Sequence, residues 1–320
     1  MSVWQPLIEK QIGYLFGLSD SIAIVEAKNP GLLASVKNGN MIVASDYSGQ
    51  HKEATHEAYS FLVTTDEALN EWLPSLAAFR QRWLPDGRRI SFKKLNEPLR
   101  RQALWPFLDT ATRLSGNLIT ILVNRQVGSF ISGGPVAAKD AFPDCFPANA
   151  NRGTVEKMLR LASFVALILS GLRREDQLSY WISDHDEALD SHEKREQFAR
   201  LATYLTFGVT GWRHAADHQF GTTESSAAPY WSEDLAALAD LAAGAYCQLS
   251  SYLPAFSSDS SEDNWRIRMA SSGVKSLRAR AIGDWLAKRR GALKHVLLRL
   301  ELDGDLKIRI SAQAFLAQPS

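Results

Sequence analysis

The chain has 320 residues, of which 45% are hydrophobic and 22% charged, and its formal net charge at pH 7 is +1. These fractions are those of a globular protein that can bury a sizeable core. The net charge gives no global signal for nucleic acid or membrane, so any basic surface must be local.

Cysteine content and hydropathy exclude several further classes. Cys145 and Cys247 are far apart, which excludes a disulfide scaffold and a cysteine zinc cage and suits a reducing compartment. No apolar run reaches the roughly 18 residues of a membrane-spanning helix. The N-terminus lacks the basic-then-apolar pattern of a secretion signal. We therefore expect a cytoplasmic protein without a membrane partner.

Strand-like and helix-like segments alternate along the chain. Residues 40–46 contain a short apolar run that ends at Ser45-Asp46, before a turn signal at Ser48-Gly49, and this pattern indicates a buried strand. Further strands are predicted at residues 59–65, 88–95, 117–124 and 178–184. Helices are predicted at about residues 66–84, 96–115, 153–172, 232–253 and 274–290, with another that ends near residue 207. Residues 209–232 have no clear periodicity.

The order of these segments predicts an α/β fold. A hairpin is expected at residues 294–312, where two alternating runs flank an Asp303-Gly304 turn. The predicted architecture is a mixed sheet that opens with a hairpin and carries helices on both faces. The expected domains are an N-terminal helical prefix (1–38), a central domain (39–255) and a C-terminal appendage of a basic helix and a hairpin (256–320).

Three aspartates lie where the local pattern predicts burial. Asp46 and Asp184 each end a predicted strand, and Asp240 lies inside the nearly all-apolar helical segment AALADLAAGAY. A buried carboxylate is costly unless a partner compensates its charge. Structural roles stay open for each: a turn or cap aspartate, or a group bonded to a backbone N–H or an arginine. Together the three are what a divalent-metal site needs, because Mg²⁺ prefers oxygen ligands.

The same segments carry a resemblance to a known family. The motifs in chain order are Asp46-Tyr47-Ser48-Gly49 at a strand end, a later strand that ends in Asp184, and Leu238-Ala239-Asp240-Leu241-Ala242-Ala243-Gly244 on a helix. Over roughly residues 40–253 they resemble the ribonuclease H-like superfamily, and more closely the bacterial family named domain of unknown function 3800. The sequence departs from that family at Tyr47, where glutamate is usual. No acidic residue is obvious near the third predicted strand except Glu97.

The resemblance implies a metal-dependent nuclease with two Mg²⁺ or Mn²⁺ ions at the scissile phosphate. It assigns Asp46 to bridge the ions, and Asp184 and Asp240 to complete one side each, as catalytic metal ligands. Asp186 and Glu97 are reserve ligands. The alternative is a catalytically decayed binding or regulatory subunit on the same fold, with a protein partner in a bacterial defence or toxin–antitoxin complex. A metal hydrolase of a small phosphate ester or nucleotide is a third interpretation.

Basic residues cluster locally despite the small net charge. Such clusters are solvated faces in the simplest interpretation, but they also bind the phosphate backbone of DNA or RNA, and nucleic acid is the partner that we expect. The candidate nucleic-acid-binding residues are Arg88, Arg89, Lys93, Lys94, Arg278, Arg280, Arg289 and Arg290. His214 and His218 have zinc-like spacing for a helix, but their segment lacks the neighbouring glutamate of a metalloprotease and a clear helical pattern.

Overall fold

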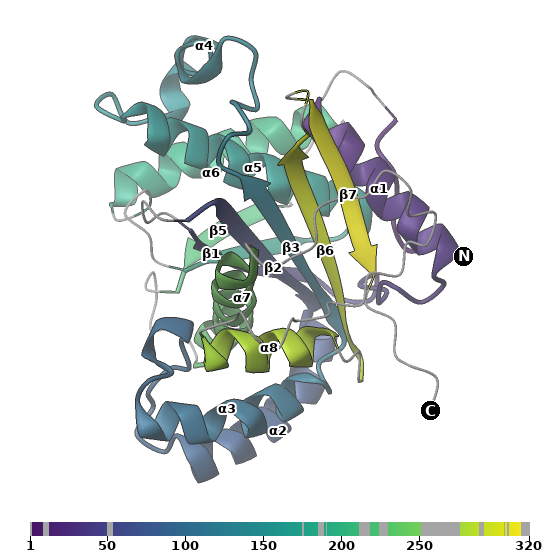
Figure 1. Cartoon of the computed structure of the whole chain (residues 1–320), viewed down its shortest axis with the longest axis vertical. Helices are drawn as coiled ribbons and strands as arrows, with labels where there is room; N and C mark the ends of the chain where they lie inside the picture. The colour runs from purple at the N-terminus through teal and green to yellow at the C-terminus, as the bar shows by residue number, and fades with distance from the viewer. Residues whose placement is uncertain are drawn as a thin grey trace.

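The computed structural model is a mixed sheet covered by helices on both faces (Figure 1). The residues that it describes are 2–8, 13–49, 54–174, 176–184, 189, 191–210, 218–223, 230–250, 276–287, 291–303, 305 and 307–314. The strands are β1 (Met41–Ser48), β2 (His56–Thr65), β3 (Gly116–Asn124), β4 (Ser179–Ser183), β5 (His218–Thr222), β6 (Leu293–Leu302) and β7 (Ile308–Ala314). The α-helices are α1 (Tyr14–Lys28), α2 (Asp66–Trp83), α3 (Pro98–Ala111), α4 (Gly134–Ala141), α5 (Arg152–Leu172), α6 (His192–Thr210), α7 (Tyr230–Leu249) and α8 (Leu277–Ala287). Two short 3-10 helices are η2 (Phe92–Lys94) and η3 (Pro143–Cys145).

The strands form a single sheet in the order β5-β4-β1-β2-β3-β6-β7. β2 is antiparallel to both β1 and β3, whereas β4 is parallel to β1, and β5 is parallel to β4. β6 is parallel to β3 and forms an antiparallel hairpin with β7. Because β1 and β4 are parallel neighbours, with Ser45 paired to Ser183, their carboxyl ends lie at the same edge of the sheet.

Alternate strand residues face two separate cores. Met41 and Val43 of β1 face the core that also contains residues of α1, α4, α5 and α6, whereas Ile42 and Ala44 face the core beneath α2, α3, α7 and α8. Strands buried on both faces need apolar residues at nearly every position, which explains the continuous apolar runs in β1 and β3. No helix in the described ranges has both the length and the apolar character needed to cross a membrane.

The α/β prediction is confirmed, but the predicted strand at residues 88–95 is wrong. Ile90 and Phe92 of this segment are buried in the core beneath α7, so the alternation reflects real burial. The Phe92 N–H, however, donates to Asp240 and not to a neighbouring strand, and the segment contains only the 3-10 turn η2. An irregular segment that buries every second side chain has the same sequence pattern as a strand.

The sequence pattern also misses β5, which lies at one edge of the sheet. Its sequence, HQFGT, contains glycine and polar residues, so it lacks the β-branched enrichment by which strands are identified. The strand forms because it pairs in parallel with β4 from end to end, His218 opposite Ser179 and Thr222 opposite Ser183. Its pairing is therefore a property of the assembled sheet.

The described parts of the two terminal segments, expected as a prefix (1–38) and an appendage (256–320), pack on the central sheet or extend it. Trp4 is buried, and Glu26 of α1 accepts hydrogen bonds from its N–H and from the Val3 N–H. The C-terminal hairpin that we predicted is present, but β6 pairs along β3 and so extends the central sheet. α1 lies against β7, so an N-terminal helix and the C-terminal strand of the sheet are neighbours (Figure 1).

Gly244 of α7 gives a test of how η2 is fixed. A Cβ at this position would overlap the Phe92 ring. We expect Gly244→Ala to lower the free energy of unfolding by about 1–3 kcal/mol, because overpacking outweighs alanine's helix-propensity gain of roughly 1 kcal/mol. Gly208→Ala in α6 is the matched control, since the space at its Cβ is empty, and we expect it to be neutral or stabilising. Urea unfolding measures both, and a neutral Gly244→Ala would contradict this packing.

Candidate acidic site

The three predicted aspartates lie together on the α7 side of the sheet. Asp46 occupies the face of β1 that also carries Ile42 and Ala44, both of which pack into the core beneath α7. Asp184 directly follows β4 and extends its pairing, because its N–H donates to the Ser45 carbonyl at 2.9 Å. α7 packs across β1 and carries Asp240, whose charge acts on Asp46 together with that of Asp184.

An arginine lies between these carboxylates. Arg89 Nη1 and Nη2 each lie 2.6 Å from an oxygen of Asp184, which makes the pair bidentate, and Nη2 lies 3.6 Å from Asp46 Oδ2. The Arg89 backbone is held separately, since its carbonyl accepts a 2.7 Å hydrogen bond from Arg100 Nε and the next residue, Ile90, is buried. The sequence placed Arg89 in a basic cluster for nucleic acid; in the structure it is an internal partner of the acidic site.

Asp240 is bound by the same segment. Its Oδ2 accepts a 2.7 Å hydrogen bond from the Phe92 N–H, and the Ser91 hydroxyl also bonds to it. Residues 89–92 thus supply a cation to Asp184 and Asp46 and neutral donors to Asp240. Sequence reasoning missed this role because it interpreted the segment as a strand.

The electrostatics of the site reflect three carboxylates around one guanidinium. Burial, followed by the charges of Asp240 and Asp184, holds the pKa of Asp46 well above its usual range, although Arg89 opposes the shift. Burial also raises the pKa of Asp240, against the Phe92 hydrogen bond and the Arg89 charge. Burial opposes ionisation of Arg89, but the hydrogen bonds and charge of Asp184 outweigh it and raise the arginine pKa. Arg89 therefore stays charged.

The residues in this arrangement do not fit a divalent cation. Within the described ranges, no group of three or more His, Cys, Asp and Glu side chains is arranged to hold a metal ion. The guanidinium of Arg89 takes up both oxygens of Asp184 and lies beside Asp46, where a metal would need the same oxygens. Mg²⁺ or Mn²⁺ at this site stays a prediction from the resemblance.

The two reserve ligands are not part of this arrangement as described. Glu97 precedes α3, where it accepts a hydrogen bond from Arg100 and lies 3.6 Å from Arg88. Asp186 lies outside the described residues. Glu97 is therefore engaged with arginines of its own segment.

Some of the predicted nucleic-acid-binding residues contact other residues of the protein, and others are exposed to solvent. Arg278 packs over the Phe92 ring at 4.7 Å and donates to the carbonyls of Phe92 and Lys93. Arg88 pairs with Asp86, and Arg280 of α8 is half-buried. Lys93 and Lys94 are exposed. Two further candidates, Arg289 and Arg290, lie outside the described residues.

Of the histidine pair, the structure places His218 on a strand and not on a helix. His218 begins β5, and its Nδ1 bonds to the Ser179 hydroxyl at 3.0 Å. Burial and the charge of Arg173 lower the pKa of His218 to about 4. His214 lies outside the described residues.

A second polar cluster lies on the same face of the sheet, on β2, β3 and β6. Glu301 Oε1 is 3.0 Å from His56 Nε2 and 2.6 Å from Arg299 Nη2, and Glu301 Oε2 accepts from Asn124 at 3.2 Å. Burial opposes ionisation of Glu301, but the hydrogen bond from His56 and the charges of His56 and Arg299 lower its pKa to about 2. The cluster joins β6 to the central strands.

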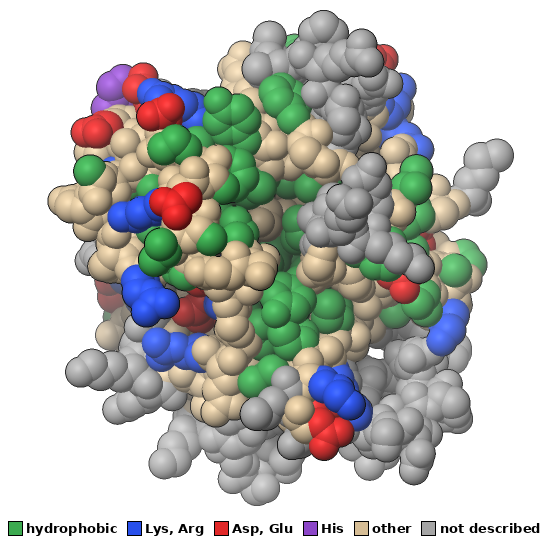
Figure 2. Space-filling view, turned by 90° about the horizontal axis from the view of Figure 1, so that it is seen from above, with side chains coloured by type: hydrophobic (Ala, Val, Ile, Leu, Met, Phe, Trp, Pro, Cys, Tyr) green, Lys and Arg blue, Asp and Glu red, His purple; other side chains and the backbone are tan. Residues whose placement is uncertain are grey.

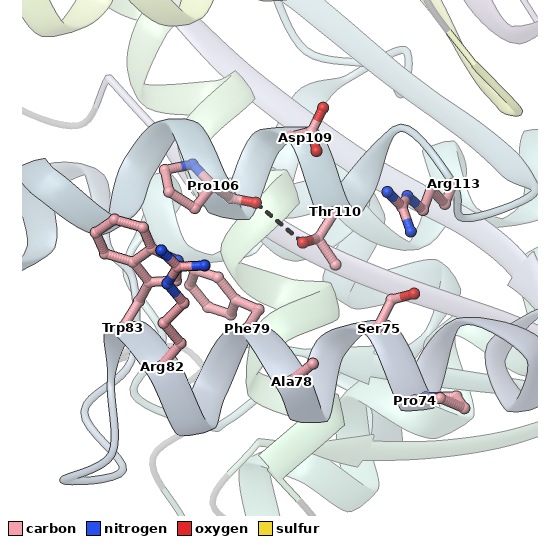
Figure 3. A pocket seen from close by; sticks show the side chains of 10 residues that line it. All are labelled: Pro74, Ser75, Ala78, Phe79, Arg82, Trp83, Pro106, Asp109, Thr110 and Arg113. Carbon is pink, nitrogen blue, oxygen red and sulfur yellow. Dashed lines mark hydrogen bonds between the residues drawn. The ribbon is translucent and has the colours of Figure 1, made fainter.

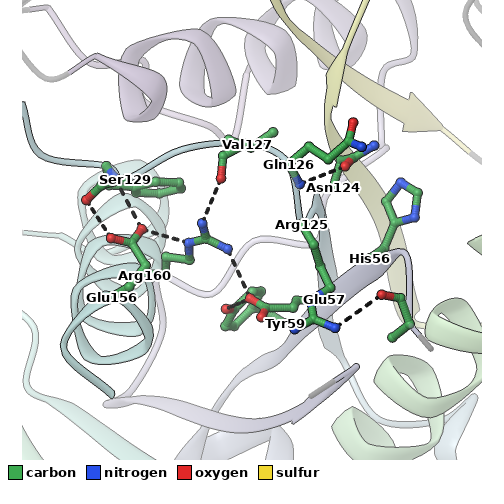
Figure 4. A network of polar contacts seen from close by, with 12 residues as sticks. His56, Glu57, Tyr59, Asn124, Arg125, Gln126, Val127, Ser129, Glu156 and Arg160 are labelled. Atoms are coloured by element: carbon green, nitrogen blue, oxygen red, sulfur yellow. Dashed lines mark hydrogen bonds and ion pairs between the residues drawn. The ribbon is translucent and has the colours of Figure 1, made fainter. Parts of the chain in front are cut away.

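A third network lies on the opposite face of the sheet, around the buried Arg160 of α5 (Figure 4). Its guanidinium bonds to Glu156 at 2.9 Å, to Glu57 at 3.0 Å and to the Val127 carbonyl at 3.1 Å. The Tyr59 hydroxyl donates to Glu57. Every acid in the network already has a cation, so it ties α5 and the loop after β3 to β2.

A surface groove lies between α2 and α3 (Figure 3) and has a volume of about 440 Å³. Arg82 lies over the Trp83 ring at 5.4 Å on one side of it, and Arg113, in the turn after α3, lines it as well. None of the three aspartates lines this groove. On the face seen in Figure 2, charged side chains of both signs are mixed, with apolar ones between them. That view has no continuous basic surface among the described residues.

No protein-family model matches the chain, and no curated protein is significantly similar to it.

Substitution of the two strand-end aspartates separates their roles. We expect Asp184→Asn to lower the free energy of unfolding by about 1–3 kcal/mol, because the bidentate pair with Arg89 is lost. We expect Asp46→Asn to be neutral or stabilising, because it relieves carboxylate repulsion and keeps an oxygen for the Tyr47 N–H. Urea unfolding of both variants checks this, and equal losses would show that Arg89 does not favour Asp184.

The Glu301 cluster makes stability depend on pH. Its folded pKa of about 2 lies below the ordinary value of 4.5, so the ionised carboxylate stabilises the fold above about pH 4.5, and this contribution is lost as the pH falls toward 2. We expect Glu301→Gln to be less stable than wild type by about 1–3 kcal/mol at pH 7 and the difference to narrow in acid. Urea unfolding at pH 7 and pH 3 measures the gap; a constant gap would contradict the lowered pKa.

Proposed function

We propose that this chain is a nucleic-acid-binding protein of ribonuclease H-like architecture whose acidic site is closed to metal by its own arginine. The sheet supports the architecture, since β2 lies antiparallel between β1 and β3, and β4 and β5 continue in parallel beside β1, as in a ribonuclease H-like fold. The positions of Asp46, two residues before the end of β1, and of Asp184, directly after β4, support it as well. A protein partner in a bacterial defence complex belongs to the same proposal.

The observation that carries the proposal is the bidentate ion pair between Arg89 and Asp184. A two-metal nuclease needs its carboxylate oxygens free to bind cations. Here one carboxylate has both oxygens bonded to a guanidinium, and a second lies 3.6 Å from it. This geometry favours a binding protein over a nuclease.

Exposed cations beside the acidic site supply the binding surface. Lys93 and Lys94 lie in η2, directly after the Phe92 that bonds to Asp240, and both are exposed. Arg101, in the first turns of α3, is exposed too. A phosphate backbone held by these residues would pass close to the aspartates. Phosphate contacts of this kind do not depend on sequence, so the proposal covers DNA and RNA.

A metal-dependent nuclease is the second candidate, and one observation favours it. Asp46, Asp184 and Asp240 come from separate parts of the chain and nevertheless share a site, where mutual repulsion and burial disfavour them. A protein that only binds nucleic acid has no need of that cluster. Cleavage would require Arg89 to leave Asp184.

Binding and cleavage assays on the wild-type chain decide between the two. We expect fluorescence anisotropy to detect binding of single- or double-stranded DNA or RNA in EDTA, with affinity that falls as salt rises. We expect no cleavage with Mg²⁺ or Mn²⁺. Metal-dependent cleavage that Asp46→Asn abolishes would replace this proposal with the nuclease, and absence of binding to all four substrates would remove it.

Charge-reversal substitutions in η2 test where the proposed nucleic-acid-binding surface lies. We expect Lys93→Glu and Lys94→Glu each to weaken binding and to reduce the slope of log affinity against log salt by about one unit, because each removes a phosphate contact. Lys307→Glu is the matched control, because Lys307 is exposed on the β6–β7 hairpin, away from η2. A slope that changes only in the control would place the surface elsewhere.

A further inference from the structure

We infer that Arg89 is the residue that excludes divalent cations from the acidic site, and that its replacement turns the three aspartates into a metal-binding site. This inference rests on the proposed function, because it explains why the site is closed. Asp46, Asp184 and Asp240 are of the residue type that binds divalent cations, but their contacts with Arg89 do not fit a metal ion.

Arg89 contacts the carboxylate oxygens that a metal ion would need as ligands. Arg89 Nη1 and Nη2 bond to the two oxygens of Asp184, at 2.6 Å each, and Nη2 also lies 3.6 Å from Asp46. A metal that used Asp184 and Asp46 as ligands would compete with the guanidinium for the same oxygens. The planar fork of arginine matches a carboxylate in two bonds, which makes it an effective competitor.

The charge balance of the site also depends on Arg89. Three carboxylates share a single guanidinium, so Arg89 alone does not balance the charge of the site when all three are ionised. Arg89 Nε is buried and has no hydrogen-bond partner, so the guanidinium is held from its outer nitrogens only. Removal of the guanidinium leaves three carboxylates with no internal cation, and a dication is the species that such a set attracts most strongly.

We expect the site to keep its structure when the Arg89 side chain is replaced. The Arg89 carbonyl accepts from Arg100, and Ile90 and Phe92 are buried on either side of Ser91, so the backbone does not depend on the guanidinium. Asp240 keeps its bond from the Phe92 N–H. The side chains of Asp184 and Asp46 are 19% and 13% exposed, so an ion has access from solvent.

The test is Arg89→Met in the full-length chain, which keeps the aliphatic stem and removes the charge. Arg88→Met is the matched control, because the neighbouring arginine pairs with Asp86 at the surface. Titration with MnCl₂ by calorimetry, together with melting temperatures, measures binding without any activity. We expect Arg89→Met to bind Mn²⁺ at least about tenfold more tightly than wild type and to melt higher with Mn²⁺, whereas Arg88→Met behaves as wild type.

Adding Asp184→Asn to Arg89→Met identifies the ligand, and we expect that double variant to lose the gain. Wild-type binding as tight as that of Arg89→Met overturns the inference, and so does a folded Arg89→Met that binds no Mn²⁺. If Arg89→Met does not fold, Arg89→Gln decides by the same two results. Nucleic-acid binding by the wild type is measured separately, so its absence counts against the proposed function and leaves the Mn²⁺ result to be judged alone.

Discussion

Two carboxylates at the ends of parallel strands, with a third on the helix above them, create a negative charge that a protein interior does not tolerate without a cation. Arg89 is that cation, and its bidentate pair with Asp184 is the contact around which the site is arranged. The segment between α2 and α3 carries Arg89 and lies at the edge of the sheet, beside the two strands. Along the way Phe92 supplies the N–H that binds Asp240, so one irregular segment closes the site from both sides.

Arginines fasten this segment as well as closing the site. Arg80 of α2 pairs with the buried Asp234 of α7 and donates to the Arg88 carbonyl at 2.8 Å. Arg100 of α3 bonds to the Arg89 carbonyl, and Arg278 of α8 bonds to that of Phe92. Guanidinium groups suit this task because they present several donors in a fixed plane. Arg89 and Arg278, two members of the basic cluster that resembles a nucleic-acid surface in the sequence, are therefore bonded within the protein.

How far the sequence predicts this structure depends on the range of the interaction. The strand ends at Asp46 and Asp184 follow from local apolar runs, and parallel pairing then brings them together, so both the α/β class and the choice of these aspartates could be made from the sequence. The role of Arg89 could not, because it depends on the path of an irregular segment whose alternating burial imitates a strand. β5 could not be predicted from the sequence for a related reason, because it is a strand through its pairing with β4 and not through its own composition.

The negative charge of the three aspartates can be neutralised in more than one way, and the cation that balances it determines the chemistry of the site. A pair of dications would balance the three aspartates with charge drawn from solvent, and would leave the carboxylates ionised and available as ligands. A single guanidinium supplies less charge than a pair of dications. Burial raises the pKa values of Asp46 and Asp240, and repulsion from the neighbouring carboxylates adds to the rise. Arg89 gives the site an internal cation in the absence of metal, and under the proposed function the same guanidinium keeps metal-dependent hydrolysis from this site.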